Sequence, residues 1–264
     1  MPRINCGNIH VNVVEQGKGV PLVLVHGYPL DHSMWQGQLD GLSADCRLIA
    51  PDLRGFGASD VTPGTATMAQ MADDIAALLD ALGVREPIVF CGLSMGGYVA
   101  WQFAIRHAHR LAKLILCDTR VVADSKEAAE GRHKTAEKVL GAGSGIAAEG
   151  ILPKLFAPAT YEQQPQIVEA TRQVILRTNP AGIAAALRGM AEREDFTSRL
   201  AHIGVPTLVL CGEHDKISPP DEMNSFAKQI PHAQFVQIAG AGHMAPLEQP
   251  GTVNAAIRDF LKRP

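Results

Sequence analysis

A serine stands at the centre of the pentapeptide Gly92-Leu93-Ser94-Met95-Gly96. The apolar run 87–91 precedes it and apolar residues at helical spacing follow it, so the pattern predicts a strand, a sharp turn and a helix. Such a turn exposes the Ser94 hydroxyl at the C-terminal edge of a sheet and at a helix N-terminus, where the local field favours negative charge. Without that context the pentapeptide would be an ordinary Gly/Ser turn. Within it, Ser94 is predicted to be a nucleophile.

A serine hydroxyl is a weak nucleophile at neutral pH, so it needs a base within hydrogen-bond reach and a carboxylate that orients the base. His243 lies in a glycine-rich loop after the last apolar run, 234–238. Asp215 follows the apolar run 205–211. The order Ser94, Asp215, His243 is the order expected for a serine on such a strand–turn–helix element. We therefore predict His243 as the base and Asp215 as the acid.

Two other residues compete for these roles. His214 directly precedes Asp215, which is too close along the chain for that carboxylate to orient it, so a structural role is expected. Asp118 ends the apolar run 113–118 and is an alternative for the acid. Its other interpretation is a capping carboxylate at the entrance to the segment that follows. Replacing each aspartate with alanine decides between them.

Attack by Ser94 on a carbonyl group creates an oxyanion, which needs two preorganised N–H donors. The backbone N–H of Met95, directly after the nucleophile, is the first candidate. The second is the backbone N–H of Tyr28, in the loop that follows the apolar run 21–25. Pro29 has no N–H and is expected to fix this loop.

Three residues near the same loops are expected to support the site. His26 is predicted to hold its loop by hydrogen bonds, and Asp52 and Arg54 are predicted to brace the loops around the site. Trp35 has two equally weighted interpretations, a residue that lines the substrate pocket and a packed core aromatic.

The elements that must position these residues form an alternating pattern. Apolar runs that suit buried strands alternate with segments that suit helices, which favours an α/β protein with a mostly parallel sheet covered on both faces. Ligands bind at the carboxyl ends of the strands in such sheets. Residues 9–14 alternate and predict an antiparallel edge strand. Buried strands are expected at 21–25, 48–50, 87–91, 113–118, 205–211 and 234–238, with helices at 34–43, 67–82 (capped by Thr67), after Ser94 to about 108, 219–230 and 249–262.

Residues 120–198 break this alternation. They contain helical segments separated by glycines and prolines, without good strand runs. The economical interpretation is a helical cap, or lid, over the strand ends. We therefore expect a core domain formed by residues 1–119 and 199–264 and a cap formed by residues 120–198.

The composition is that of an ordinary globular protein, with 264 residues, 46% hydrophobic and 19% charged. The net charge of −3 predicts no nucleic-acid or membrane partner. The N-terminal stretch lacks the pattern of a secretory signal, and no window of about 18 apolar residues could span a membrane. Five scattered cysteines predict buried thiols in a reducing cytoplasm, and their spacing does not suit a metal site.

The segments HGYP, PDLRGFGASD, GLSMGG, GEHDKISPP and GAGHMAPLEQP resemble the α/β-hydrolase superfamily. Within it the chain is similar to serine esterases of the 3-oxoadipate enol-lactonase-like and cofactor-free haloperoxidase/perhydrolase-like groups. The resemblance implies a helical cap inserted after the sixth strand. Ser94 stands where haloalkane dehalogenases and epoxide hydrolases carry an aspartate nucleophile, so neither activity is expected.

The resemblance implies hydrolysis of small to medium-sized carboxylic esters or lactones through an acyl-enzyme, without a metal or organic cofactor. The same triad can serve carbon–carbon bond hydrolysis or perhydrolysis, and some relatives on this fold are ligand sensors. The oligomeric state is not predicted. Apolar residues of the cap are the candidates for the substrate pocket: Leu152, Leu155, Phe156, Ile175, Leu187 and Met190.

Overall fold

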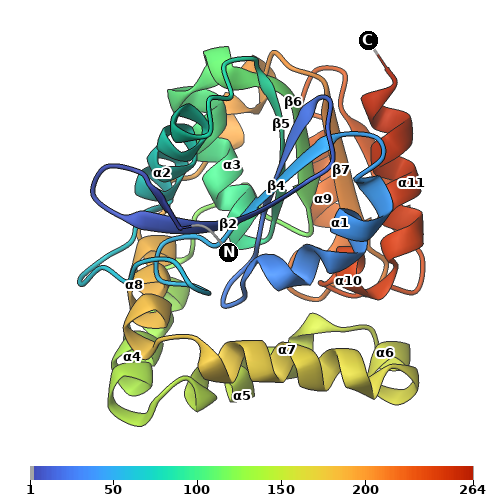
Figure 1. Cartoon of the computed structure of the whole chain (residues 1–264). Helices are drawn as coiled ribbons and strands as arrows, with labels where there is room; N and C mark the ends of the chain where they lie inside the picture. Colours follow the sequence, from blue (N-terminus) through green and yellow to red (C-terminus); the bar gives the residue numbers. More distant parts are fainter. Residues whose placement is uncertain (1–2, 264) are drawn as a thin grey trace.

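A single sheet organises the chain, and the computed structural model describes residues 3–263. The strand order is β1-β2-β4-β3-β5-β6-β7-β8 (Figure 1). β2 is antiparallel to both of its neighbours, and the pairs from β4 to β8 are parallel. The strands are β1 (Arg3–Asn5), β2 (His10–Gln16), β3 (Pro21–Val25), β4 (Arg47–Pro51), β5 (Ile88–Leu93), β6 (Leu111–Cys117), β7 (Thr207–Gly212) and β8 (Gln234–Ile238).

Helices cover the sheet on both faces, which confirms the predicted α/β class. Every residue of β3, β5 and β7 is buried, as strands covered on both sides require. α2 and α3 lie on one face, and α1, α9 and α11 lie on the other (Figure 1). The helices outside the insertion are α1 (Gln36–Leu42), α2 (Met68–Ala81), α3 (Met95–Arg106), α9 (Pro220–Ala227), α10 (Ala245–Glu248) and α11 (Pro250–Leu261), with 3₁₀ helices η1 (His32–Trp35), η2 (Ala108–Arg110) and η3 (Thr197–His202).

The predicted edge strand is wrong in its position. β2 includes residues 10–14 of the expected 9–14 but pairs on its outer side with β1, so it is the second strand of the sheet. β1 has three residues, too few for an alternating pattern to be recognised. Met1 and Pro2, which belong to the stretch considered for a secretory signal, lie outside the described residues. The predicted cap of α2 is confirmed, since the Thr67 side chain accepts a hydrogen bond from the Gln70 N–H (3.1 Å).

A helical segment follows β6, as expected. It leaves the sheet after β6 and returns before β7, and its middle helices form a layer alongside the core (Figure 1). Within residues 3–263, no helix combines the length and apolar character needed to cross a bilayer. The helices of this segment are α4 (Lys126–Ala142), α5 (Gly145–Leu155), α6 (Pro158–Gln163), α7 (Pro165–Arg177) and α8 (Pro180–Ala191).

All five cysteines are buried and free. The Sγ atoms of Cys91 on β5 and Cys117 on β6 lie 3.8 Å apart between adjacent strands. The thiols of Cys91 and Cys117 are therefore part of the core of the sheet.

Candidate active site

Ser94 occupies the turn between β5 and α3. Its backbone has φ +53° and ψ −111°, in the left-handed region that side chains larger than glycine rarely adopt. The Ser94 N–H donates to the Cys117 carbonyl (3.0 Å), and its own carbonyl accepts from the Thr119 hydroxyl (2.7 Å). Ser94 is half-buried, whereas its neighbours in the turn are buried. The strained residue is thus held at the end of the strand with its side chain accessible.

Glycines around Ser94 allow the backbones to approach. A Cβ on Gly92 would overlap the backbone of Gly96, on the first turn of α3. A Cβ on Gly96 would in turn overlap the carbonyl oxygens of Val25 and His26 at the end of β3. The strand, the start of α3 and the loop after β3 are therefore packed backbone against backbone. This contact brings the Tyr28 loop beside Met95.

Asp215 and His243 form a buried pair. The distance from His243 Nδ1 to Asp215 Oδ2 is 2.8 Å. Asp215 also accepts hydrogen bonds from the Ile217 N–H (2.7 Å), the Ser218 N–H (3.1 Å) and the Ser218 hydroxyl (2.5 Å). Burial alone would raise the pKa of Asp215, but the charge of His243 and the hydrogen bonds from His243 and Ser218 outweigh it and lower the pKa. Asp215 is therefore a carboxylate that accepts a hydrogen bond from the Nδ1–H of His243 and so orients its ring.

The loops that carry this pair lie against each other at one edge of the sheet. Asp215 follows β7, His243 follows β8, and the two strands are neighbours. A Cβ on Gly212 would overlap the Gly242 carbonyl oxygen, so the two loops touch through backbone. Since parallel strands end at the same edge, Ser94 after β5 faces the same region.

Asp118, the alternative acid, has different partners. It follows β6 with φ +46°, and its Oδ1 accepts from the Gly212 N–H (2.7 Å). Within residues 3–263, its buried Oδ2 has no hydrogen-bond partner. Burial first, and then the charge of Asp215, raise the pKa of Asp118 well above its usual range. The orienting hydrogen bond to His243 thus comes from Asp215, whereas Asp118 is a buried carboxyl with a raised pKa that holds the Gly212 N–H.

The loop after β3 is braced as expected. His26 Nε2 accepts from the Leu53 N–H (2.9 Å), so Nδ1 carries the proton and donates to the Gly27 carbonyl (2.9 Å). Burial lowers the pKa of His26, which fits this neutral form. Tyr28 and Pro29 are joined by a cis peptide bond. Met95 is the first residue of α3, and the N–H at that position has no partner inside a helix.

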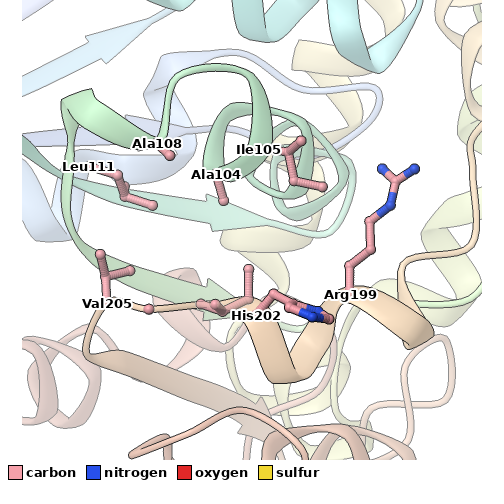
Figure 2. A pocket seen from close by; sticks show the side chains of 9 residues that line it. Ala104, Ile105, Ala108, Leu111, Arg199, His202 and Val205 are labelled. Carbon is pink, nitrogen blue, oxygen red and sulfur yellow. The ribbon is translucent and has the colours of Figure 1, made fainter.

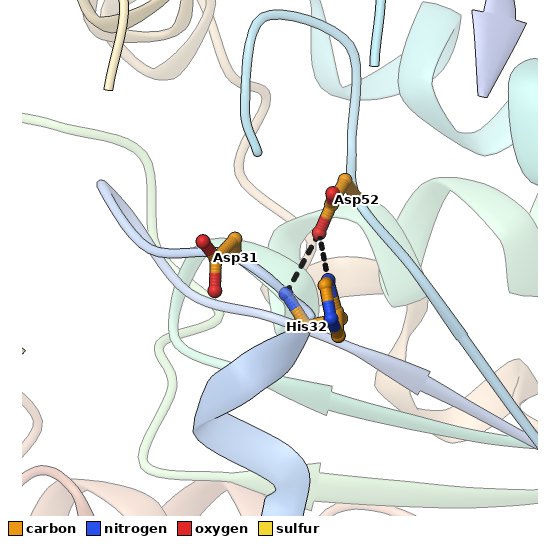
Figure 3. Close-up of side chains that lie close together, drawn as sticks. All are labelled: Asp31, His32 and Asp52. Carbon is orange, nitrogen blue, oxygen red and sulfur yellow. Dashed lines mark hydrogen bonds and ion pairs between the residues drawn. The ribbon is translucent and has the colours of Figure 1, made fainter. Parts of the chain in front are cut away.

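Asp52 braces a second loop, at the end of β4. Its Oδ1 accepts from the backbone N–H (2.9 Å) and the ring Nδ1 (2.6 Å) of His32, as Figure 3 shows. Its Oδ2 accepts from Asn12 (2.8 Å) and the Ala58 N–H (2.9 Å). Asp31, His32 and Asp52 each place one ligand-type atom within 4.8 Å of the others. Because the oxygens of Asp52 already accept these hydrogen bonds, the cluster suits a structural brace better than a metal ion.

Arg54 has a separate structural role. Its guanidinium makes two hydrogen bonds of 2.5 Å to Asp74 on α2, and both side chains are buried. His214 lies with its Nε2 3.8 Å from a carboxylate oxygen of Glu213, at the surface. Neither residue shares a hydrogen bond with Ser94, Asp215 or His243 among those that the structure describes.

The predicted pocket residues are dispersed. Trp35 is fully buried on η1, as a packed core aromatic is. Phe156 lies beside the His243 loop, since a Cβ on Gly242 would overlap its backbone. Met190 contacts Arg132 through its sulfur (3.6 Å). The other candidates pack in the helical segment, buried or half-buried: Leu152, Leu155, Ile175 and Leu187.

Two cavities differ in their relation to these loops. A surface groove of about 520 Å³ lies between residues 104–111 and residues 199–205 (Figure 2). It is at the far end of α3, about 15 Å along the helix from Ser94. A cavity of about 270 Å³ lies between η1 and α7, with mostly apolar walls. Leu30, two residues after Tyr28, and Leu247, four residues after His243, both line this second cavity, whereas Ser94, Asp215 and His243 are not among the residues that line it.

Three supporting residues were not anticipated. Ser218 contacts both members of the buried pair, 2.5 Å from Asp215 and 3.4 Å from His243. Glu248 is buried and accepts from the Gly242 N–H (2.7 Å) and the Ala157 N–H (2.8 Å), which joins the His243 loop to the helical segment. Thr119 holds the Ser94 carbonyl. The signal for Ser218 was its spacing of three residues from Asp215, a common pattern for side-chain capping.

Comparisons with known proteins fit this geometry. The family model described as the alpha/beta hydrolase fold matches residues 20–250. The chain belongs to the α/β-hydrolase fold family. This membership agrees with the eight-stranded sheet and with the turn at Ser94.

Three proteins that are similar to this chain indicate which hydrolases it resembles. A thermophilic esterase from Thermogutta terrifontis, solved with malate bound, has a TM-score of 0.95 and 51% identity, over 96% of this chain and 93% of that chain. The enol-lactonase from Burkholderia xenovorans has a TM-score of 0.90 and 29% identity, over 98% of both chains. 3-oxoadipate enol-lactonase 2 from Acinetobacter baylyi is 29% identical over 88% of this chain and 84% of its own length. These similarities extend the resemblance to hydrolases that act on esters and lactones.

Proposed function

We propose that this α/β-hydrolase is a serine hydrolase that cleaves carboxylic esters or lactones of small to medium size. The observation that carries the proposal is the strained, half-buried Ser94 at the same sheet edge as the buried Asp215–His243 pair. Strained backbone persists where the surrounding structure enforces it, and a strand–turn–helix serine is a typical nucleophile. Ser94 is the nucleophile, His243 the base and Asp215 the acid.

The first half-reaction forms an acyl-enzyme. Asp215 accepts a hydrogen bond from His243 Nδ1–H, which leaves Nε2 free to accept a proton. His243 Nε2 removes the Ser94 hydroxyl proton as Oγ attacks the carbonyl carbon. The backbone N–H groups of Tyr28 and Met95 stabilise the oxyanion. His243 then protonates the leaving alcohol as the acyl–oxygen bond breaks.

The second half-reaction releases the acid. Water enters, His243 takes one of its protons, and the hydroxide attacks the acyl carbon of the Ser94 ester. The oxyanion forms again on the same N–H donors. Collapse returns the proton from His243 to Ser94. Apart from the substrate and the water molecule, each group in this cycle belongs to the chain.

Residues 120–198 form the cap in this proposal. The hydrogen bonds of Glu248 attach the start of α6 to the His243 loop, so the helical segment borders the predicted base. The apolar cavity between η1 and α7 receives part of the substrate, because Leu30, two residues after Tyr28, and Leu247, on the helix directly after the His243 loop, contribute to its walls. Apolar walls of this volume suit a short acyl or alkyl group.

The relatives support ester and lactone substrates. The Thermogutta terrifontis protein is named an esterase, and two further relatives are named enol-lactonases. Their names motivate the choice of substrates for a test.

The test combines turnover with active-site labelling. We expect the wild type to hydrolyse 4-nitrophenyl esters of graded acyl length or simple lactones, and to form a covalent adduct with a fluorophosphonate. Ser94→Ala should lose at least about 10³-fold in kcat and form no adduct. Ser198→Ala, at an exposed serine of η3, is the matched control and should keep both.

Two outcomes would contradict the proposal. Equal labelling of wild type and Ser94→Ala would place the reactive group elsewhere. A stoichiometric burst without steady turnover on any ester or lactone would favour a ligand sensor instead. A diketone and hydrogen peroxide with acetate, added to the panel, would identify carbon–carbon hydrolysis or perhydrolysis on the same serine.

A further inference from the structure

The Asp215 carboxylate divides its hydrogen bonds between its two oxygens. Oδ1 accepts from the backbone N–H groups of Ile217 (2.7 Å) and Ser218 (3.1 Å). Oδ2 accepts from the Ser218 hydroxyl (2.5 Å) and from His243 Nδ1–H (2.8 Å). The backbone therefore anchors one oxygen, whereas the oxygen that orients the predicted base is shared with a second side chain.

Ser218 is held firmly against this pair. It is fully buried, and its Oγ also lies 3.4 Å from His243 Nδ1. Its carbonyl oxygen lies 3.4 Å from the thiol of Cys211, at the end of β7. A hydroxyl carries a single hydrogen, and a charged carboxylate oxygen at 2.5 Å is the strongest acceptor within its reach. Ser218 therefore donates to Asp215 Oδ2.

The Ser218 hydroxyl and the His243 ring compete for the charge of one oxygen. A hydrogen bond to a carboxylate oxygen withdraws part of its negative charge and so weakens its attraction for a nearby cation. Protonated His243 is such a cation, and it forms whenever the base takes up a proton. Removing the hydroxyl would leave both backbone hydrogen bonds to Oδ1 in place and would leave Oδ2 to His243.

Other titratable groups lie in the segments around this pair, and a change at Ser218 leaves their side chains as they are. Any difference between wild type and a Ser218 variant therefore reports on the shared oxygen. The buried groups among them are Asp118 after β6, Cys211 on β7 and Glu248 on α10, and the exposed groups on the loop after β7 are Glu213, His214 and Lys216.

We propose that Ser218 is a positioning residue, which shares the orienting oxygen of Asp215 with His243 and so sets the lowest pH at which His243 acts as a base. The inference rests on the proposed function, because that function assigns the role of base to His243. Ser218 acts through Asp215. Without its hydroxyl, Oδ2 keeps more negative charge, protonated His243 is stabilised, and a higher pH is needed to free the base.

The first experiment measures kcat/KM against pH with one 4-nitrophenyl ester, followed at the isosbestic wavelength of 4-nitrophenol. In Ser218→Ala the acidic limb of this profile should move up by about 0.5–1 pH unit. The loss of kcat/KM relative to wild type should thus be about 3–10-fold greater at pH 5.5 than at pH 8.5. A serine that only supports the turn would give the same relative loss at every pH.

Two further variants separate the hydroxyl from packing. Threonine and valine have the same shape, and only threonine carries a hydroxyl. Ser218→Thr should keep the acidic limb of wild type, whereas Ser218→Val should follow Ser218→Ala. Ser225→Ala, at an exposed serine of α9, is the control and should keep the wild-type profile.

The second experiment follows His243 itself and does not depend on turnover. In ¹⁵N NMR spectra of histidine-labelled protein, the His243 signals are those that His243→Asn lacks. Their titration midpoint should be about 0.5–1 pH unit higher in Ser218→Ala than in wild type. An unchanged midpoint, or a loss of kcat/KM that is uniform with pH, would refute the role of Ser218 while the esterase proposal stands. If no ester or lactone is cleaved but the midpoint moves, the esterase proposal fails and the sharing of Oδ2 stands.

Discussion

Two buried aspartates, Asp215 and Asp118, lie at neighbouring strand ends and have opposite properties. Hydrogen bonds and the charge of His243 lower the pKa of Asp215, whereas burial and the charge of Asp215 raise that of Asp118. Two adjacent buried carboxyl groups oppose each other's ionisation, so the pKa values of such a pair move apart. The group with the lowered pKa is the one that holds His243.

This difference gives a prediction for each aspartate. Asp215→Ala should lower kcat by about 10³–10⁴-fold, because His243 loses the group that fixes its tautomer. Asp118→Asn should stay within about threefold of wild type, because an amide of the same shape can still accept from the Gly212 N–H and Asp118 makes no hydrogen bond to His243 among the described residues. Steady-state kinetics on one ester measure both. A severe loss in Asp118→Asn together with an active Asp215→Ala would reverse the assignment of the acid.

At the scale of elements, the β5–α3 turn depends on close backbone packing. Gly96→Ala would press a Cβ onto the carbonyl oxygens at the end of β3, which have no freedom to move away. We expect a loss of about 3 kcal/mol in the free energy of unfolding and a large loss of activity. Gly131→Ala, in the interior of α4 with open space around it, should instead stabilise the protein by about 1 kcal/mol. Urea unfolding distinguishes them, and similar values for both variants would contradict the packing argument.

The contact between β4 and η1 is sensitive to pH. Burial opposes ionisation of Asp52, but the hydrogen bonds from His32 prevail and lower its pKa to about 2. A lowered carboxyl pKa stabilises the fold above the unfolded pKa of about 4, and this stabilisation is lost as the pH falls towards 2. The hydrogen bond to Asp52 raises the pKa of His32 in the folded state. The stabilisation that protonated His32 contributes is therefore lost as the pH rises above 6.5 and through this raised pKa.

We therefore expect Asp52→Asn to lower the free energy of unfolding by about 2 kcal/mol at pH 6. The difference from wild type should shrink between pH 4 and pH 2. Urea unfolding at pH 6, 4 and 3 measures it. Asp259→Asn, which removes an exposed partner of Lys262, is the control and should cost less than about 1 kcal/mol. A difference that stays constant with pH would refute the role of ionisation.

At the scale of the whole molecule, polar contacts join the helical segment to the core, and two of them lie in different environments. Glu248 is buried and holds the N–H groups of Ala157 and Gly242. Arg177, at the end of α7, pairs with Asp31 (2.9 Å) and is 59% exposed, while the buried Asp31 also accepts hydrogen bonds from the backbone and hydroxyl of Ser33. Buried N–H groups left without a partner are costly, whereas exposed ion pairs contribute little.

Glu248→Ala should therefore lower the free energy of unfolding by about 2–4 kcal/mol and reduce activity through the His243 loop. Arg177→Ala should change stability by less than about 1 kcal/mol. Thermal or urea unfolding of the two variants tests the contrast. If Arg177→Ala were the more damaging change, the exposed contact would be the one that fixes the helical segment.

The sequence was most informative where a pattern is local. The turn at Ser94, the cap at Thr67 and the strand 234–238 are read from neighbouring residues, and the structure has them at those positions. Contacts between distant segments leave no such pattern. The hydrogen bonds of Glu248 and the cavity wall shared by Leu30 and Leu247 depend on loops that meet only in the folded chain. The short strand Arg3–Asn5 was missed because three residues show no periodicity.

The buried cysteines have a practical consequence for chemical labelling. Only the thiolate form reacts with an alkylating reagent, and burial raises the pKa of Cys6 and Cys46 to about 11. In the native state both the geometry and the low thiolate fraction block the reaction. Alkylation followed by mass spectrometry will therefore measure the fraction of molecules in which the structure around a cysteine has unfolded locally. Cys91 and Cys117 report opening of the sheet beside Ser94, and Cys46 reports opening near β4. The chain thus carries its own probes of local unfolding, without any engineered label.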